Sequence, residues 1–237
     1  MNTRGIFGQY CPLAMSTEFL CQRWTMLILR EVFFGSNTFN DIARGVPRMS
    51  RTLLSNRLKE LVEIGILIRK EKKASGHVNY SFTKAGKALE PVVMSMANWG
   101  QEWLQIEPSI ENIDVDFLMW DIRRNTNLLP ELPDPFIAHF FLLGVPENKA
   151  NHWLVCEQGE ADLCHIDKGF KNDIEIEVDV KILTKVWMGW SSFEVAVAKG
   201  DLIIEGPKSL TEITKQWLGH SSVANIKKAD LKDRVNY

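Results

Sequence analysis

The 237-residue sequence lacks several features that would place it in a specialised class of protein. No stretch reaches the roughly 18 consecutive apolar residues that a membrane-spanning helix needs. The first residues, MNTRGIFGQYCPL, carry neither the apolar core nor the small-residue cleavage site of a secretory signal. No low-complexity tract interrupts a composition of 45% hydrophobic and 24% charged residues. We therefore expect a cytoplasmic protein that acts away from the membrane.

The sequence also lacks the short motifs that mark common catalytic centres. It contains no GxSxG nucleophile elbow, no HExxH zinc motif, no phosphate-binding loop and no glycine-rich dinucleotide turn. The carboxylates Glu175, Glu177 and Asp179 alternate with apolar residues, a spacing typical of the solvated face of a strand. We expect neither an enzyme nor a bound cofactor.

Cysteine is scarce, and its spacing argues against both a disulfide framework and a metal site. The sequence contains four cysteines: Cys11, Cys21, Cys156 and Cys164. They form no CxxC pair, so we expect free thiols in a reducing compartment. Cys164 and His165 are adjacent on a predicted strand and would point to opposite faces. His152 and Cys156 could share a face, but no second pair completes a tetrahedral set.

Charge is divided unevenly along the chain. Residues 1–105 carry 14 Lys and Arg against 8 Asp and Glu, a balance of +6. Residues 106–237 carry 14 against 22, a balance of −8. A basic half followed by an acidic half favours two domains with different partners, although charge also drifts along any long chain. The acidic, proline-containing segment 106–116 is the predicted linker between them.

The basic half carries helical patterns separated by short turns. Residues 16–34 place apolar side chains close to helical spacing and end at Gly35. A short helix is predicted over 38–45 and another after Ser50, with Pro47 in the turn between them. Two short helices joined by such a turn predict a helix-turn-helix, whose second helix enters the major groove of DNA.

The stretch PRMSRTLLSNRLKELVEIG, residues 47–65, supplies this second helix. Leu54, Leu58 and Leu61 recur at the spacing that buries one helix face. The predicted DNA-contacting residues are Arg48, Ser50, Arg51, Thr52, Ser55, Asn56, Arg57 and Lys59. Arg can pair with guanine and Asn with adenine, whereas Arg48, Arg57 and Lys59 are better placed to clamp phosphates. A basic face that is merely solvated is the simpler alternative.

A basic hairpin follows the predicted recognition helix. ILIRKE and VNYSFT alternate as strands do, and ASGH between them supplies a turn that contains glycine. This arrangement predicts a winged helix-turn-helix. The wing carries Arg69, Lys70, Lys72 and Lys73, with His77 at the end of its turn, and it suits contact with the sugar-phosphate backbone.

A further helix is predicted over 84–104. Its apolar stripe runs from Leu89 to Trp103, and Pro91 predicts a kink or a break. Such a helix has little of its own domain left to pack against. We expect a homodimer formed through this helix and the first helix, because helix-turn-helix proteins commonly read paired half-sites.

Beyond residue 116 the pattern changes to mixed helices and strands. Helices are predicted over 117–127, 183–200 and 209–219, and strands over 136–145, 151–159, 160–167, 174–182 and 201–206. This order predicts an α+β domain over 117–225 and a polar tail over 226–237. One set of aromatic residues predicts either a ligand pocket or an ordinary core: Phe140, Trp153, Trp187, Trp190, Phe193 and Trp217.

Two family resemblances extend these predictions. The order YCPL, RWTMLILRE, LLSNRLKELVEIGIL, FTKAG and LEPV, from Cys11 to Trp103, resembles the HxlR family of bacterial winged-helix regulators. It implies a homodimer that binds inverted-repeat operators in double-stranded DNA, with wings at the minor groove. Cys21 and Gln22 depart from the small residues usual in that family. LTKVWMGW and AVAKGDLIIEGPKSLTEITKQWL resemble sterol carrier protein-like domains, which implies an apolar tunnel for a lipid-like ligand.

These patterns together predict a transcription regulator. A winged-helix DNA-binding and dimerisation domain over 1–105 is joined to an α+β domain over 117–225 that senses an apolar small molecule. Such a protein is cytoplasmic, and associated with the nucleoid when bound to DNA.

Two other functions stay open. Cys11 lies where some HxlR proteins sense thiol oxidation, although no charged neighbour activates it and a small buried side chain is the simpler interpretation. The second alternative is a lipid carrier or scaffold in which the winged domain only dimerises.

Overall fold

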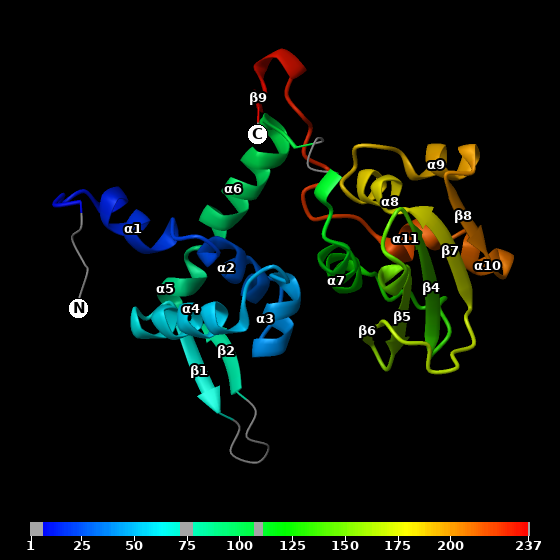
Figure 1. The fold of residues 1–237 in the computed structure, drawn as a ribbon, viewed down its shortest axis with the longest axis horizontal. Coiled ribbons are helices and arrows are strands. Elements are labelled where there is room, and N and C mark those ends of the chain that lie inside the picture. Colours follow the sequence, from blue (N-terminus) through cyan, green and yellow to red (C-terminus); the bar gives the residue numbers. More distant parts are fainter. Residues whose placement is uncertain (1–6, 72–77, 107–110, 237) are drawn as a thin grey trace. The chain divides into compact units, whose positions relative to one another are not determined.

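The computed structural model describes residues 7–71, 78–106 and 111–236. Contacts within the chain define two compact units, Met1–Met96 and Ala97–Tyr237. Figure 1 shows their helices and strands, coloured along the sequence. The division falls inside one helix, α6 (Glu90–Trp103), so the predicted linker over 106–116 belongs to the second unit by this criterion. The domain limits drawn from the sequence remain a prediction.

The first unit consists of helices and one antiparallel hairpin. Its elements are α1 (Pro12–Leu20), α2 (Thr25–Phe33), α3 (Phe39–Gly45), α4 (Arg51–Glu63), β1 (Leu67–Glu71), β2 (Val78–Phe82), α5 (Lys84–Lys87) and the start of α6. The hairpin pairs Leu67 with Phe82 and Glu71 with Val78. This order is that of a winged helix-turn-helix, as the sequence predicted.

Two predicted helices of this unit are each divided in the structure. The helix predicted over 16–34 breaks around Trp24, whose left-handed backbone (φ 77°) cannot continue a helix. The helix predicted over 84–104 is divided into α5 and α6, and Pro91 is the second residue of α6. Proline is tolerated there because the first turn of a helix has no partner for its missing N–H.

The core of the first unit gathers the apolar faces of these helices. Ile28 and Leu29 of α2, Ile42 of α3 and the predicted leucines of α4 are buried together. Phe33 stacks on Phe82 with ring centroids 4.0 Å apart. This contact joins α2 to the second strand of the hairpin.

The second unit is a mixed α/β fold, in agreement with the prediction. Its described helices are the end of α6, α7 (Val115–Asn125), α8 (Val180–Trp187), α9 (Phe193–Lys199), α10 (Lys208–Thr211) and α11 (Thr214–Leu218), with 3-10 turns at Glu147–Lys149 and Leu231–Asp233. Its strands are β3 (Leu104–Gln105), β4 (Phe136–Leu143), β5 (Asn151–Glu157), β6 (Glu160–Cys164), β7 (Ile174–Asp179), β8 (Leu202–Glu205) and β9 (Val235–Asn236). The helix predicted over 183–200 is divided into α8 and α9, with Gly189 at φ 71° between them.

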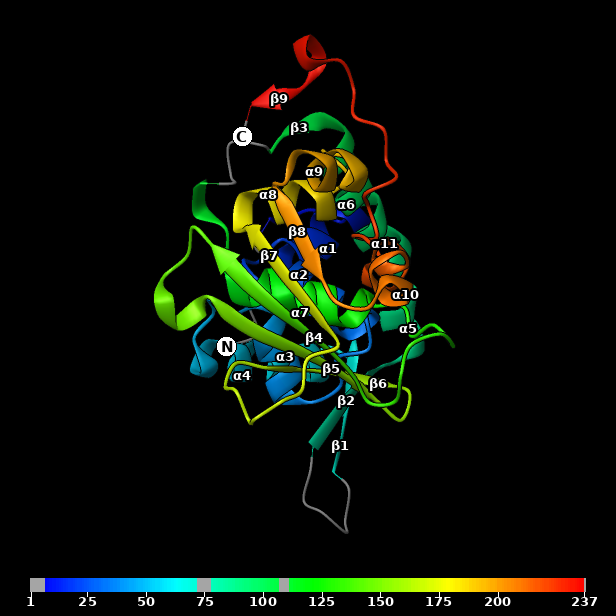
Figure 2. The ribbon, with the colours of Figure 1, turned by 90° about the vertical axis from the view of Figure 1, so that its right-hand side faces the viewer.

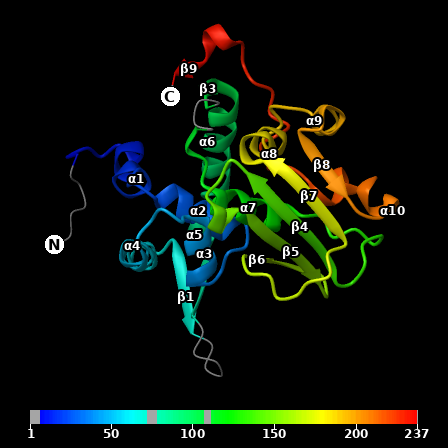
Figure 3. The same ribbon diagram turned by 45° about the vertical axis from the view of Figure 1, so that its right-hand side comes forward.

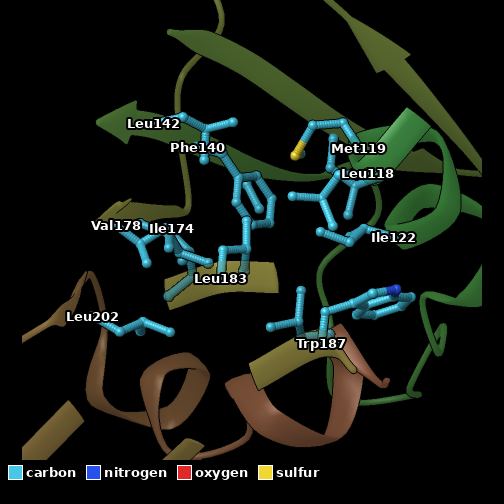
Figure 4. Close-up of a cluster of buried hydrophobic side chains, with 14 of the residues drawn as sticks. Leu118, Met119, Ile122, Phe140, Leu142, Ile174, Val178, Leu183, Trp187 and Leu202 are labelled. Atoms are coloured by element: carbon cyan, nitrogen blue, oxygen red, sulfur yellow. The ribbon is translucent and has the colours of Figure 1, made fainter. Parts of the chain in front are cut away.

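A five-stranded sheet forms the centre of the second unit. The strand order is β6-β5-β4-β7-β8, and Figures 2 and 3 show the strands side by side in this order. β4 runs parallel to β7, and the other neighbours are antiparallel. Phe136, Phe140 and Leu142 alternate inward along β4. They meet apolar side chains of α7 and α8 in one buried cluster (Figure 4).

The last residues of the chain are part of the second unit. The amide of Ala229 donates to the carbonyl of Glu102 at 3.0 Å, and β9 pairs in parallel with β3. Gln101 is buried, donates to the carbonyl of Met188 at 3.1 Å and accepts from the indole of Trp190 at 3.3 Å. The predicted polar tail therefore returns to the end of α6. Within the described parts of the chain, no helix has the length and apolar character needed to cross a bilayer.

His152 makes the stability of the second unit depend on pH. Its ring is fully buried in β5, and burial, together with the neighbouring His165, lowers the pKa of His152 to about 4. The unfolded chain takes up this proton near pH 6.5, so below that pH the unfolded state holds more protons and the fold loses stability. We expect a loss of about 2 kcal/mol in unfolding free energy between pH 7 and pH 5. His152→Phe should flatten this dependence in denaturant titrations, and an unchanged slope in the variant would contradict the assignment.

Candidate nucleic-acid interface

The turn between α3 and α4 is built from capped helix ends. Thr38 caps α3, since its hydroxyl accepts from the amide of Asp41 at 3.2 Å and donates to the Asp41 carboxylate at 2.6 Å. Ser50 caps α4 by accepting from the amide of Leu53 at 3.3 Å. Caps of this kind satisfy backbone N–H groups that have no partner inside the helix. Ser50, predicted to contact DNA, therefore also has a structural role.

A buried carboxylate holds α2 against the end of α3. Glu31 has no exposed surface and accepts two hydrogen bonds from Arg30, at 2.8 and 2.9 Å. The same guanidinium donates to the carbonyl of Gly45 at 2.9 Å. A buried charge is tolerated when it is paired in this way. The end of α3, and with it the turn that leads to α4, is thereby tied to α2.

The exposed face of α4 carries most of the predicted DNA-contacting residues. Leu54, Leu58 and Leu61 are buried, as the spacing predicted. Arg51, Thr52, Ser55, Asn56 and Lys59 are exposed along the other side of the helix. Arg48 is exposed in the turn before it. The structure thus brings together one continuous surface of hydrogen-bond donors and acceptors.

Arg57 differs from the other predicted contacts. Its side chain is only 14% exposed, and its guanidinium donates to the side chains of Gln22 and Glu60. A phosphate contact by Arg57 would have to replace these hydrogen bonds. This role of Arg57 stays a prediction.

Arg51 is oriented by two residues that the sequence patterns did not single out. Its Nη1 donates to Oδ1 of Asn40 at 3.0 Å, and its guanidinium carbon lies 5.6 Å from the centre of the Phe39 ring. Both partners lie in the first turn of α3. Sequence spacing cannot predict that residues 39 and 40 contact residue 51, because this contact depends on the angle between α3 and α4.

The hairpin extends from the same side of the unit as the start of α3. The amide of Tyr80 donates to the carbonyl of Asn37 at 2.7 Å, and Thr38 and Asn79 form an isolated bridge. Arg69 and Lys70 are exposed on β1. Lys72, Lys73 and His77, the other predicted wing contacts, lie outside the described residues.

The structure does not gather the six predicted aromatic residues into one group. Phe140, Trp187 and Trp217 are buried in the core of the second unit. Trp153 stacks on His139 at 4.7 Å, on the other face of the sheet, and Trp190 and Phe193 are half-buried. A cavity of about 130 Å³ lies between residues 128–134 and 156–159, and none of the six lines it.

The cysteines and histidines show no metal centre among the described residues. No group of three or more His, Cys, Asp or Glu side chains there has suitable geometry. Burial raises the pKa of the Cys156 thiol to about 11. Cys11 is exposed, so the interpretation of that residue as a small buried side chain is wrong for the isolated chain.

Comparisons with known proteins agree with the geometry of the first unit. A family model described as HxlR-like helix-turn-helix matches residues 19–108. The uncharacterized HTH-type transcriptional regulator YvaP of Bacillus subtilis is 35% identical over 104 residues, which cover 43% of this chain and 94% of YvaP. The chain belongs to the HxlR-like helix-turn-helix family. A second relative, the uncharacterized HTH-type transcriptional regulator sll1512 of Synechocystis sp., is 32% identical over 101 residues, covering 42% of this chain and 75% of the relative.

Solved structures of other regulators also resemble part of the chain. The redox regulator HypR in its oxidized form is 29% identical and has a TM-score of 0.37, covering 38% of this chain and 95% of HypR. The reduced form of the transcriptional regulator YodB from B. subtilis is 30% identical and has a TM-score of 0.36, covering 39% of this chain and 93% of YodB.

Gly45 is required by the buried carboxylate of this HxlR-like unit. A Cβ atom at position 45 would overlap the carboxylate of Glu31. We expect Gly45→Ala to lower the unfolding free energy by about 1–3 kcal/mol, although alanine favours a helix more than glycine does. The matched control is Gly100→Ala, also in a helix, where the new Cβ would lie an ordinary 3.7 Å from Leu104. Equal effects of the two substitutions in denaturant titrations would argue against the packing constraint.

Proposed function

We propose that this HxlR-type transcriptional regulator binds operator DNA as a homodimer, with α4 in the major groove and the β1–β2 wing at the minor groove. The observation that carries the proposal is the exposed polar face of α4. Arg51 and Asn56 have the donors and acceptors to read base edges, and Thr52 and Ser55 lie between them. Lys59 and Arg48 suit phosphate contacts, and Lys72, Lys73 and His77 are the proposed contacts of the wing.

The homodimer is proposed from apolar side chains that the isolated chain leaves in solvent. Leu13 and Met15 of α1 are 70% and 55% exposed. Val92, Met96 and Trp99 lie at i, i+4 and i+7 on one face of α6, and Met96 and Trp99 are each more than half exposed. Soluble monomers rarely expose such stripes, and a second copy of the same chain would cover both of them.

DNA recognition can be tested with the full-length protein on a random duplex pool. We expect an enriched inverted repeat with half-sites about one helical turn apart. Arg51→Ala and Asn56→Ala should each weaken binding to the enriched site by about 5- to 150-fold and relax one base position. Lys59→Ala should weaken binding to all sequences alike. It should also reduce the slope of log affinity against log salt concentration by about one unit. Unchanged affinity and base preference in both Arg51→Ala and Asn56→Ala would refute the interface.

The dimer can be tested by sedimentation of the full-length protein. Met96→Glu places a charge in the proposed interface and should shift the protein to monomers in the micromolar range. Ile166→Glu is the matched control, because Ile166 is also exposed but lies in the second unit away from α1 and α6 in the sequence. A dimer that survived Met96→Glu, or dissociated equally with Ile166→Glu, would exclude this interface.

A second function, sensing of an apolar small molecule, is favoured by two groups in the second unit. Trp217 and His152 are fully buried, and neither the indole N–H nor the two imidazole nitrogens has a hydrogen-bond partner among the described residues. Phe140 neighbours both of them: it is paired with His152 across the strands, and its ring is edge-on to that of Trp217 with centroids 6.5 Å apart. Buried groups of this kind cost about 1–3 kcal/mol each, which a ligand with a hydrogen-bond acceptor would offset. The sterol carrier-like resemblance agrees with such a ligand.

Trp217→Phe tests this second function because it keeps an aromatic ring and removes the N–H. Because the smaller ring leaves a cavity in the core, we expect the ligand-free variant to lose about 1–3 kcal/mol of unfolding free energy. Its affinity for Nile red, a neutral apolar dye with a carbonyl acceptor, should fall by at least about 5-fold. A variant that bound Nile red as tightly as the wild type would contradict the proposed role of Trp217.

Redox control through Cys11 remains the alternative mode of regulation. The thiol is exposed just before α1, so oxidants can reach it. The third possibility is a carrier whose winged domain only dimerises. The DNA-binding experiment distinguishes it, because such a carrier has no salt-dependent affinity for DNA.

A further inference from the structure

The two arginines of α4 differ in their exposure and in their hydrogen-bond partners. Arg57 turns back toward its own unit and is hydrogen-bonded to Gln22 and Glu60. Arg51, at the first position of the helix, is exposed and contacts the first turn of α3. Of the two, Arg51 is the arginine whose side chain is exposed on the face of α4 that is proposed to contact DNA.

The contacts of Arg51 come from a rigid part of the unit. The Phe39 ring is half-buried and packs against the buried core of the first unit, which limits its movement. Thr38 caps the turn that carries Asn40. The hydrogen bond from Arg51 Nη1 to Asn40 Oδ1 and the approach to the Phe39 ring together define the plane and the direction of the guanidinium.

This orientation leaves the reading capacity of the arginine intact. A guanidinium carries five N–H donors in a planar fork, and the bond to Asn40 uses one of them. The remaining donors can form the two parallel hydrogen bonds that guanine O6 and N7 accept. A side chain that is already oriented loses less conformational freedom when it binds.

We propose that Asn40 and Phe39 are positioning residues that aim Arg51 at one base of the operator, so that they determine base preference without contacting that base. The inference rests on the proposed DNA-binding function of α4. A purely structural role, in which the same contacts only hold α3 to α4, would instead change stability and all base positions together.

The test begins with selection from a random duplex pool by the full-length wild type and by Arg51→Ala. The base position whose preference disappears in Arg51→Ala is the one that Arg51 reads. Asn40→Ala should flatten the preference at that same position and weaken binding to the enriched site by about 3- to 10-fold. Phe39→Leu should have a smaller effect at the same position. In Asn40→Ala, affinity for unrelated duplex and the thermal midpoint should stay at wild-type values.

A double-mutant cycle separates positioning from direct contact. If Asn40 acts through Arg51, Asn40→Ala has no further effect in the Arg51→Ala background. If Asn40 touches DNA itself, its effect persists there, and the inference is overturned. The matched control is Asn37→Ala, an exposed asparagine three positions earlier, which should leave the Arg51 position unchanged.

Three further outcomes would also overturn the inference. Asn40→Ala could leave the preference at the Arg51 position intact, or it could flatten every position together with a lower thermal midpoint. If the wild-type protein enriched no sequence at all, the proposed DNA-binding function would be contradicted. The inference about Asn40 and Phe39, which rests on that function, would then be wrong as well.

Discussion

The helix-turn-helix depends on one buried ion pair. Glu31 has no access to water, and its charge is compensated by the guanidinium of Arg30, which is partly exposed. Arg30 in turn holds the last carbonyl of α3, at a glycine where a side chain would collide with the carboxylate. The position of α3 follows from these contacts, and the first turn of α3 then orients Arg51. A charge in the core thus determines how a side chain on the surface is presented.

The two faces of α4 were largely predictable because one physical rule governs them. Leucines at 54, 58 and 61 must be buried, and this leaves positions 51, 52, 55, 56 and 59 in solvent. Arg57 lies on the flank between the two faces, where periodicity does not decide and tertiary hydrogen bonds do. The contacts of Arg51 with Phe39 and Asn40 depend on the approach of two helices, which a pattern within one helix does not contain. The break at Trp24 likewise interrupts an apolar period that looks continuous.

In the second half, alternation predicted strands but not which aromatic residues share a face. Phe140 pairs with His152 and faces the helices, whereas His139 pairs with Trp153 and faces the opposite side. A shift of one residue in register would exchange the two sets. The exposed Glu175 and Glu177 agree with the predicted solvated face, because both lie on β7 between buried isoleucine and valine side chains. The strands that carry Phe140 and Trp153 lack such alternating carboxylates, so the sequence did not reveal which face of the sheet each ring occupies.

The returning C-terminus is bonded to the end of the segment that the family model matches. The family match ends at residue 108, and β3 lies just inside that limit. β3 pairs with β9, and Glu102 accepts a hydrogen bond from Ala229, so the final residues of the chain are bonded to the final residues of the family module. The segment beyond residue 108 is therefore joined to the matched segment twice, once by the peptide backbone and once by this pairing. A deletion of the last residues would remove the partner of β3 and the hydrogen bond to Glu102, and so loosen the end of the matched segment itself.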